Sequence, residues 1–346
     1  MTRRPRLLLT ATASAACVAL LAACGGGSSD VVASGNDKPA GGANTGTIKL
    51  YAYSAPKVGF DKVIPAFNAT PQGKGINFEQ SYGASGDQSR KVAAGAPADV
   101  VNFSLEPDVT RLVDAGLVDP NWNAGPHKGI PFGSVVTIVV RKGNPKGITG
   151  WDDLLKPGVE VVTPNPFSSG SAKWNLLAPY ADKSNGGQNP QAGLDYIKQL
   201  VTDHVKIQPK SAREASETFT QGTGDALLSY ENEALFLERS GEKVEHHTPP
   251  VTFKIENPVA VMKNSKNPTA AKAFNDFLYT TAGQTAWAQA GFRPVDEAVA
   301  KQFASDFPAP QKLWTITDLG GWKTIDKALF DKENGSVAKI YNAATK

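Results

Sequence analysis

Thr163-Pro164-Asn165-Pro166-Phe167-Ser168-Ser169-Gly170-Ser171-Ala172-Lys173-Trp174 is the stretch of sequence that decides the fold prediction. It follows the apolar run 159–162, which is typical of a buried strand, and leads into residues 174–180, which are typical of a helix. The small residues between them leave backbone N–H groups and hydroxyls open to a ligand. Because the first N–H groups of a helix have no intrahelical partner and the helix dipole favours negative charge, such a turn can hold an anion. The alternative is a Ser/Gly loop that only caps the helix.

The composition is that of a globular protein, and the chain after the first arginines has no net charge. The 346 residues are enough for two domains and a large buried core. The net charge of +3 comes from Arg3, Arg4 and Arg6, because removing these three leaves 33 basic and 33 acidic residues. A clustered basic face is not apparent, so nothing favours nucleic acid as a partner.

The first 23 residues have the layout of a targeting segment, with three arginines followed by an apolar run too short to span a membrane. Its end, Leu21-Ala22-Ala23-Cys24, resembles the lipobox of bacterial lipoproteins. The resemblance implies a signal peptide at 1–23, acylation of Cys24, and anchoring of the exported protein to the outer face of the cell membrane by lipid. An ordinary secretory signal with an incidental cysteine is the alternative.

Cleavage at this point would leave Cys24 as the single cysteine of the mature chain, because Cys17 lies in the leader. That excludes an intrachain disulfide, a cysteine nucleophile and a thiolate metal site. Residues 24–46 are rich in Gly, Ser, Ala, Asn and Asp, which predicts a flexible tether.

The rest of the chain alternates strands and helices, which predicts α/β domains. Strands are expected at 47–53, 76–82, 98–103, 131–141, 159–162, 205–207, 225–230 and 249–262. Helices are expected near 60–67, 87–94, 151–155, 174–180, 193–201, 211–220 and 267–288, with an amphipathic helix in the tail. The long segments near 131–140 and 250–262 would cross between two lobes and form a hinge. We expect 47–132 and 251–305 in lobe 1, 133–250 in lobe 2, and 306–346 as C-terminal helices packing across the lobes.

Three strand–turn–helix units look alike. Their turns are Gly83-Ala84-Ser85-Gly86, the serines at 168–171, and Ser211-Ala212-Arg213. Ligands of open α/β folds bind at the carboxyl ends of the strands, where these turns lie. Turns distributed over two halves of the chain predict a ligand clamped between two lobes.

Other kinds of site find no support in the sequence. The four histidines, His127, His204, His246 and His247, lack the spacing of a helical metal pair. A Gly-x-Ser-x-Gly elbow, a P-loop and a complete dinucleotide fingerprint are absent from the sequence. We therefore expect no cofactor, no metal and no enzymatic activity.

From Thr47 onward the chain resembles the sulfate-binding protein family within the type II periplasmic binding proteins. The most specific part is 163–170, which is similar to the signature Asn-Pro-Lys-Ser-Ser-Gly-x-Ala-Arg, with Phe167 in the Lys position and Lys173 in the Arg position. Segments 139–146 and 230–235 also look like family segments. The resemblance implies a two-lobed α/β fold, each lobe a mostly parallel sheet flanked by helices, with the ligand in the interlobe cleft.

The resemblance also implies which groups hold a dehydrated sulfate. Ser85 would donate its amide, Ser169 its hydroxyl, Gly170 and Ser171 their amides, and Ala212 the amide at its helix start.

Three further residues are weaker candidates. Tyr230 stands where the family often has a tryptophan, and its phenol can still donate although its reach differs. Ser54 follows the first strand of the folded chain. Arg213 is expected to support its loop more than to touch the anion.

Protonation separates sulfate from phosphate, since phosphate carries a proton at neutral pH and needs an acceptor. A pocket of amides and hydroxyls without an inward carboxylate therefore prefers sulfate. Asp87, Asp99 and Glu231 lie near the candidate turns, and we expect each to be structural. If one of them points inward, phosphate becomes a credible ligand.

These patterns predict a monomeric, lipid-tethered solute-binding protein that delivers sulfate to the permease of an ABC importer. The alternatives are a binding protein for thiosulfate, molybdate or phosphate, an exported sulfate or phosphate ester hydrolase, and a surface interaction protein that keeps the fold without the ligand.

Overall fold

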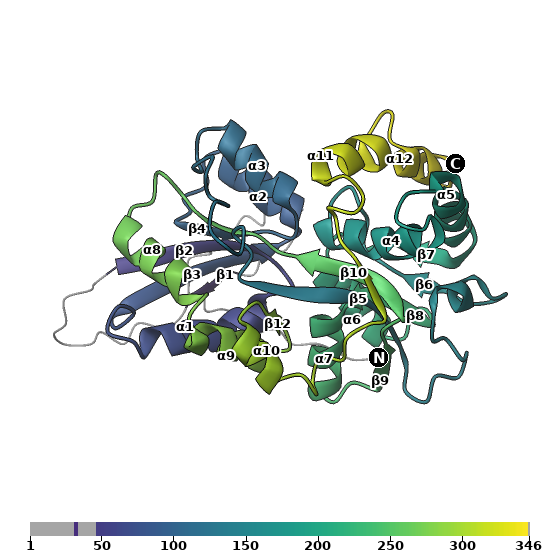
Figure 1. Cartoon of the computed structure of the whole chain (residues 1–346), viewed down its shortest axis with the longest axis horizontal. Coiled ribbons are helices and arrows are strands. Elements are labelled where there is room, and N and C mark those ends of the chain that lie inside the picture. The colour runs from purple at the N-terminus through teal and green to yellow at the C-terminus, as the bar shows by residue number, and fades with distance from the viewer. Residues whose placement is uncertain (1–30, 34–45, 345–346) are drawn as a thin grey trace, which may run out of the picture.

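The computed structural model describes residues 31–33 and 46–344 (Figure 1). The expected signal peptide, Cys17 and Cys24 lie outside the described residues. Residues 31–33 fall inside the segment expected to be a tether, and they form strand β1 (Val31–Ala33). This strand pairs antiparallel with β3 (Ile76–Gly83). Its two β-branched valines suit a strand, and the outer edge of β3 offers them unpaired backbone groups.

The first lobe is built on a five-stranded sheet in the order β1-β3-β2-β4-β11. Strand β2 is parallel to both β3 and β4, and β11 closes the sheet antiparallel to β4. The remaining strands are β2 (Gly46–Tyr53), β4 (Val100–Asn102) and β11 (Val259–Val261). The helices are α1 (Lys57–Asn68), α2 (Ser85–Ala93), α3 (Glu106–Asp114), α8 (Pro268–Phe277), α9 (Thr281–Gln289) and α10 (Glu297–Gln302).

Helices cover both faces of this sheet because its central strands are apolar on both sides. On one face α1, α8 and α9 bury an aromatic cluster in which Phe60 contacts Trp287 edge-on at 5.1 Å between ring centroids. On the other face α2 and α3 pack through Val92, Val109 and Leu112 (Figure 1). Continuous burial of this kind is typical of parallel strands inside an α/β layer.

The second lobe is built on a sheet in the order β13-β10-β5-β8-β6-β7, with β9 and β12 also pairing to β5. Its strands are β5 (Phe132–Arg141), β6 (Val161–Val162), β7 (Val205–Ile207), β8 (Ala226–Tyr230), β9 (Val244–His247), β10 (Val251–Glu256), β12 (Arg293–Pro294) and β13 (Lys312–Trp314). Its longer helices are α4 (Gly170–Lys183), α5 (Pro190–Gln199), α6 (Ala212–Thr220), α7 (Glu231–Arg239) and α12 (Ser336–Ala344). Short helical turns are η1 (Trp151–Leu155), η2 (Leu200–His204), α11 (Trp322–Ile325) and η3 (Asp326–Phe330).

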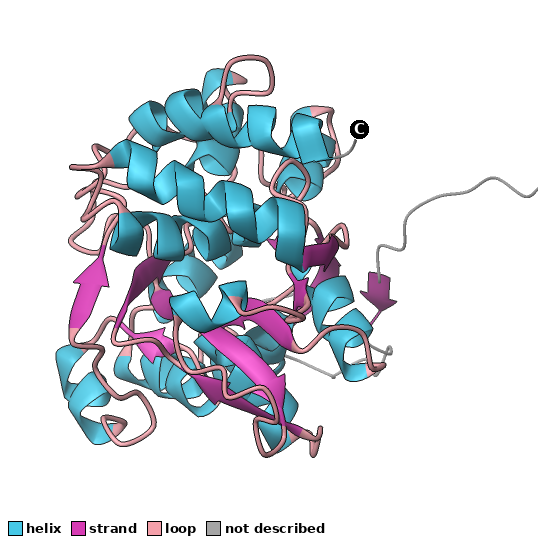
Figure 2. Ribbon diagram, turned by 90° about the vertical axis from the view of Figure 1, so that its right-hand side faces the viewer, coloured by secondary structure: helices cyan, strands magenta, loops and turns pink. Residues whose placement is uncertain are grey.

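On one side of β5 lie β8, β6 and β7, which are parallel to one another, and β8 pairs antiparallel with β5. On the other side, β10 pairs antiparallel with β5. Helices α4, α5 and α12 cover one face and α6 and α7 the other, as Figure 2 shows from the side. Strands β5 and β10 lie between the two lobes (Figure 1), where the sequence predicts crossing segments.

The prediction of one long strand at 249–262 is wrong. Strand β10 ends at Glu256, β11 begins at Val259, and the two belong to different sheets. Pro258 between them cannot donate to a strand ladder. Its carbonyl instead accepts hydrogen bonds from Phe103 N at 3.0 Å and Asn102 Nδ2 at 2.9 Å.

The predicted helical block 267–288 is likewise two helices. Helix α8 ends at Phe277, and α9 starts anew from the N-cap Thr280, whose hydroxyl accepts from Gly283 N at 3.2 Å. A threonine that satisfies a free N–H favours a new helix start over continuation of the old one.

The tail packs mainly on the second lobe. Trp322 contacts Trp174 edge-on at 4.7 Å between centroids, and Lys173 pairs with Asp326. Helix α11 also lies beside α3 of the first lobe. Among the residues that the structure describes, none of the helices is both long and apolar enough to cross a membrane.

Candidate anion-binding site

The N-terminus of α4 lacks a side-chain cap, although a serine, which often caps helices, stands at the N-cap position. Ser169 is the N-cap residue, but within residues 46–344 its side chain makes no capping hydrogen bond to the first turn. Its Oγ instead shares a hydrogen bond of 2.7 Å with Ser171 Oγ. Both side chains are buried. The first turn, beginning at Gly170, therefore keeps its N–H groups for another partner, as an anion site requires.

Helix α2 begins in a similar way. Its N-cap is Ala84, which has no side-chain acceptor. The Ser85 hydroxyl donates to Asp108 Oδ2 at 2.6 Å and accepts from Ser104 N at 2.9 Å. Asp108 is held in turn by Arg111 at 2.9 Å. Because the hydroxyl is committed to these partners, Ser85 can offer a ligand only its amide, which is the group that the family resemblance implies.

Helix α6 is capped by the residue before Ala212. The Ser211 hydroxyl accepts from Glu214 N at 3.2 Å, and Ala212 is the first helical residue. Ala212 is buried, so its amide faces little water.

Arg213 turns to the interior and supports the wall of the site. Its guanidinium lies 2.9 Å from Glu233 Oε1 and 4.5 Å from the ring centroid of Phe236. Burial raises the pKa of the fully enclosed Glu233 carboxyl, and the nearby Arg213 opposes that shift. The pair compensates a carboxylate that would otherwise be costly at this depth.

Tyr230 reaches from one lobe to the other. It ends β8, and its hydroxyl is 2.8 Å from Ser104 Oγ of the first lobe. Burial raises its pKa far above the usual value, so it remains a neutral phenol that can donate.

Ser104 is one of the points where the two lobes meet, and it was not predicted from the sequence. Its carbonyl accepts from Trp174 Nε1 at 2.9 Å and from Asn257 Nδ2 at 3.1 Å. An alanine Cβ at Gly170 would lie 2.8 Å from both Ser104 Cβ and Leu105 Cγ. The start of α4 thus presses directly against the turn after β4, and the lobes are closed on each other.

This turn, Phe103-Ser104-Leu105 between β4 and α3, is a fourth strand–turn–helix unit. A serine two residues after a buried strand was the available signal. Helix α3 is not among the helices expected from the sequence, so neither Ser104 nor the helix that carries Asp108 was predicted.

A cavity of 790 Å³ opens at the mouth of the cleft, and we call it the cleft mouth. Its lining includes Ser54, Asp87, Arg90, Lys210 and Arg213. Of the eight predicted ligand residues, Ser54 and Arg213 line this cavity.

The three carboxylates named by the sequence analysis all have structural partners. Asp99 accepts from Lys49 N at 2.8 Å and Lys266 N at 2.9 Å. Glu231 forms two hydrogen bonds with Arg293, at 2.6 and 2.8 Å.

Asp87 joins the lobes at the cleft mouth. It lies 2.5 Å from an Arg90 nitrogen in its own helix and 2.9 Å from Lys210 Nζ of the second lobe. Partial burial would raise the pKa of Asp87, but hydrogen bonds from Lys210 and Arg90 outweigh it and lower that pKa. Asp87 is therefore a charged bridge and not a proton-sharing acceptor.

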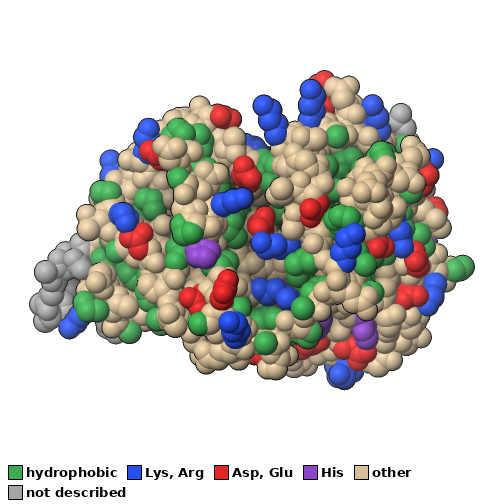
Figure 3. Space-filling view, viewed as in Figure 1, with side chains coloured by type: hydrophobic (Ala, Val, Ile, Leu, Met, Phe, Trp, Pro, Cys, Tyr) green, Lys and Arg blue, Asp and Glu red, His purple; other side chains and the backbone are tan. Residues whose placement is uncertain are grey.

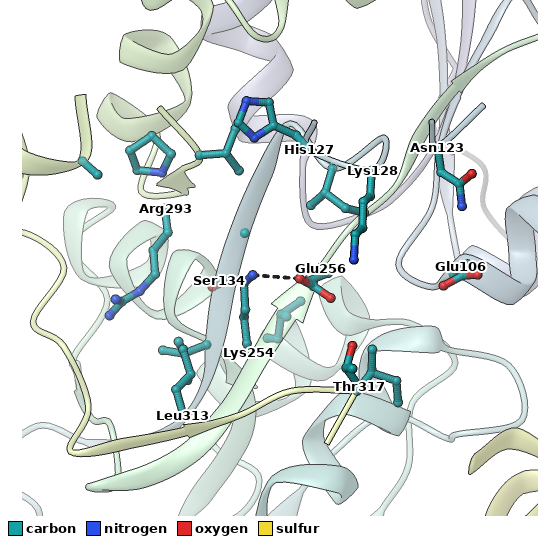
Figure 4. A pocket seen from close by; sticks show the side chains of 18 of the residues that line it. Glu106, Asn123, His127, Lys128, Ser134, Lys254, Glu256, Arg293, Leu313 and Thr317 are labelled. Atoms are coloured by element: carbon teal, nitrogen blue, oxygen red, sulfur yellow. Dashed lines mark hydrogen bonds and ion pairs between the residues drawn. The ribbon is translucent and has the colours of Figure 1, made fainter. Parts of the chain in front are cut away.

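A second cavity, of 670 Å³, lies beside strands β5 and β10 on the face seen in Figures 3 and 4. Charged side chains of both signs gather there (Figure 3). Lys254 pairs with Glu256 at 2.8 Å (Figure 4). Arg293 forms an ion pair with Glu231. None of the eight predicted ligand residues lines this cavity.

The described part of the chain holds no cluster of three His, Cys, Asp or Glu residues placed to bind a metal. His204 contacts the Val159 carbonyl at 2.9 Å, and His246 contacts Glu238 at 2.8 Å.

A family model described as bacterial extracellular solute-binding protein matches residues 48–293. The chain belongs to this family. The two-lobed α/β prediction is confirmed, as is the expectation of a solute-binding protein that is not an enzyme.

Individual relatives of this solute-binding protein carry more specific names. The sulfate-binding protein of Synechococcus elongatus is 39% identical over 321 residues, which cover 88% of this chain and 91% of the relative. The thiosulfate-binding protein of Pseudomonas aeruginosa is 31% identical over 305 residues, covering 84% and 91%. The solved structure of the sulfate-binding protein SubI from Mycobacterium tuberculosis is 63% identical, with a TM-score of 0.82, and covers 83% of this chain and 100% of that one.

Proposed function

We propose that this solute-binding protein captures sulfate in the interlobe cleft and delivers it to the permease of an ABC importer. The observation that carries the proposal is the uncapped start of α4, whose buried Ser169 and Gly170 face the turn after β4. The similarity to several sulfate-binding proteins supports the same ligand.

The proposed donors are Ser85 N, Ser169 Oγ, Gly170 N, Ser171 N and Ala212 N, with Tyr230 OH and the Ser54 amide at the edges of the site. Hydrogen bonds to a charged group contribute roughly 1.5–3 kcal/mol each. Six such bonds offset an association cost of about 4–15 kcal/mol, which makes micromolar or tighter binding feasible. Arg213 is proposed as a support for Glu233 and not as a ligand contact.

The carboxylate beside the Ser85 turn favours sulfate over phosphate. Asp108 already accepts hydrogen bonds from Ser85 and Arg111. An acceptor that is already occupied gains nothing from the proton of a phosphate ion, whereas sulfate only accepts.

Isothermal titration calorimetry of the purified protein with sulfate, thiosulfate, molybdate and phosphate tests the proposal. We expect tight binding of sulfate and at least tenfold weaker binding of phosphate. Absence of heat with sulfate would refute the proposal, and a clear preference for thiosulfate would reassign the ligand within the same family.

Replacing Ser169 by alanine is expected to weaken sulfate binding by roughly 1–3 kcal/mol, because one donor to the anion is lost. The melting temperature of the ligand-free protein should fall only slightly, since Ser169 makes no cap within residues 46–344 and the described bond that is lost is the one to Ser171 Oγ. Calorimetry and thermal unfolding measure the two effects. The exposed Ser240, changed to alanine, is the matched control, and an affinity equal to wild type would remove Ser169 from the site.

Replacing Asp87 by asparagine is expected to speed sulfate release roughly fivefold, because partly exposed ion pairs contribute up to about 1 kcal/mol. The bridge to Lys210 joins the two lobes, so its loss favours opening. The effect should shrink at high salt, which screens such pairs.

Stopped-flow release at low and high salt measures this change. Asp276→Asn is the control, because it breaks an exposed pair with Lys272 within the single helix α8. Equal release rates for wild type and Asp87→Asn would show that the bridge does not hold the cleft shut.

We further propose that lipid on Cys24 anchors the exported protein to the outer face of the membrane, near its permease. The Leu21-Ala22-Ala23-Cys24 sequence supports this proposal. Mass spectrometry of the N-terminal peptide from membranes tests it, and an unmodified N-terminus before or after Cys24 would contradict it.

A further inference from the structure

Among the residues that the structure describes, the buried hydroxyl of Tyr53 is left without a hydrogen-bond partner. Tyr53 is the last residue of β2, its side chain is buried, and its OH makes no hydrogen bond to any of the residues described here. A buried hydroxyl that loses its hydrogen bond to water without replacement costs free energy, so such groups are few in native proteins. Tyr53 therefore needs a partner that is present when the protein works.

The surroundings of this hydroxyl are those of the anion site. The rings of Tyr53 and Tyr230 lie 6.4 Å apart between centroids, and the Tyr230 hydroxyl bonds to Ser104 at 2.8 Å. Burial first, and then proximity to Tyr230 and Glu233, raise the pKa of Tyr53, so its phenol is a neutral donor. The next residue, Ser54, lines the cleft mouth.

The position of Tyr53 depends on closure of the lobes. Its strand belongs to the sheet of the first lobe. Its ring, however, packs in the hydrophobic cluster of the second lobe, together with Leu105, Trp174 and Tyr230. A donor placed in this way joins the site when the lobes close, which is when a bound anion loses its last water.

We propose that the Tyr53 hydroxyl donates a hydrogen bond to one oxygen of the bound oxyanion and so holds the closed form around it. The proposal rests on the proposed sulfate-binding function. An acceptor-only dianion satisfies the phenol without needing any proton in return. Tyr53 then acts as a first-lobe phenol opposite Tyr230 of the second lobe.

Glu233 is the competing acceptor for this hydroxyl. Its carboxylate oxygens also lack hydrogen bonds among the described residues, although Oε1 lies 2.9 Å from an Arg213 nitrogen. If the Tyr53 hydroxyl donated to Glu233 instead of to the ligand, removing it would lower the stability of the protein with or without sulfate.

The test is Tyr53→Phe, which removes the oxygen and keeps the ring. We expect sulfate to bind about 10- to 100-fold more weakly, the range for one hydrogen bond to a charged group. The loss should appear as faster release in stopped-flow experiments. The melting temperature of the ligand-free variant should equal or exceed that of wild type, because an unsatisfied buried hydroxyl is gone. Tyr279→Phe, on the first lobe and stacked on His127, is the control and should bind like wild type.

Three outcomes would overturn the inference. If wild type binds sulfate and Tyr53→Phe binds it equally well, Tyr53 is not a donor and the proposed function stands. If the variant also melts at a lower temperature without ligand, its role is structural, through Glu233. If wild type itself does not bind sulfate, the proposed function and this inference fail together.

Discussion

Gly170→Ala is expected to weaken sulfate binding at least ~100-fold, the equivalent of losing about two hydrogen bonds to a charged group. The added Cβ would lie 2.8 Å from Ser104 Cβ and from Leu105 Cγ. Ser104 and Leu105 are buried, and atoms so close to their backbone cannot move away as the end of a flexible side chain could. The lobes must then stay apart, and the donors of the first lobe no longer reach the anion.

Small-angle X-ray scattering with and without saturating sulfate measures closure, and calorimetry measures affinity. The variant should keep its lobes open at sulfate concentrations that close the lobes of the wild type. Gly125→Ala is the control, because a Cβ there meets no atom of the described chain within 4 Å. Compaction together with wild-type affinity in Gly170→Ala would show that the contact between α4 and the turn after β4 is not required for binding.

Arg293→Met is expected to lower the free energy of unfolding by roughly 3 kcal/mol, near the low end of the range for breaking a buried ion pair. Glu231 is 2% exposed, and both of its carboxylate oxygens accept from Arg293, at 2.6 and 2.8 Å. Arg293 also donates to the Pro308 carbonyl at 2.8 Å. Its removal would leave a buried carboxylate without its counter-charge, next to strand β5. Arg293 is itself partly exposed, so solvent limits the loss.

Urea denaturation of the ligand-free protein measures this effect. The double variant Arg293→Met with Glu231→Gln should recover part of the loss, because no uncompensated charge remains. Sulfate affinity should change less than stability, since neither residue lines the cleft mouth. A double variant no more stable than Arg293→Met would assign the loss to packing and not to charge.

Much of the architecture follows from local patterns in the sequence. The alternating segments at 47–53 and 76–82 form β2 and β3, and the continuous apolar run at 131–141 forms the buried strand β5. These segments are predictable because a strand buried on one face alternates apolar and polar residues, and a strand buried on both faces is a continuous apolar run.

The strand break at Asn257-Pro258 is less predictable from such traces. Both sides of it are apolar, so periodicity alone favours one strand. The strand is broken because its two halves pair in different sheets. The Pro258 carbonyl between them accepts hydrogen bonds from Asn102 and Phe103, at the end of β4. A proline in an apolar run was the warning signal.

In the candidate site, too, some features follow from local sequence patterns and others depend on distant contacts. The positions of Ser85, Ser169 and Ala212 near helix starts are predictable, because small residues after a strand mark a strand–turn–helix unit. Ser104 and Asp108 bond to partners far away in sequence, as in the Ser85–Asp108 bond across 23 residues and the Ser104–Tyr230 bond across 126. Contacts of this kind depend on how distant elements pack, and the Ser104–Tyr230 bond depends also on the closed arrangement of the lobes, which no local pattern encodes.

The chain crosses between its two sheets, and this crossing also determines the order in which the lobes can be completed as the chain emerges from the cell. Strand β4 of the first sheet must wait for β11, and the bond from Asn102 to the Pro258 carbonyl spans 156 residues. The second lobe is largely made in the interval, from β5 to β10. Closing so long a loop is slow, because its entropy is lost before its contacts form. A chain emerging from the cell would therefore expose the edge of β4 until residue 261 has followed, and this interval is when a chaperone or protease would meet it.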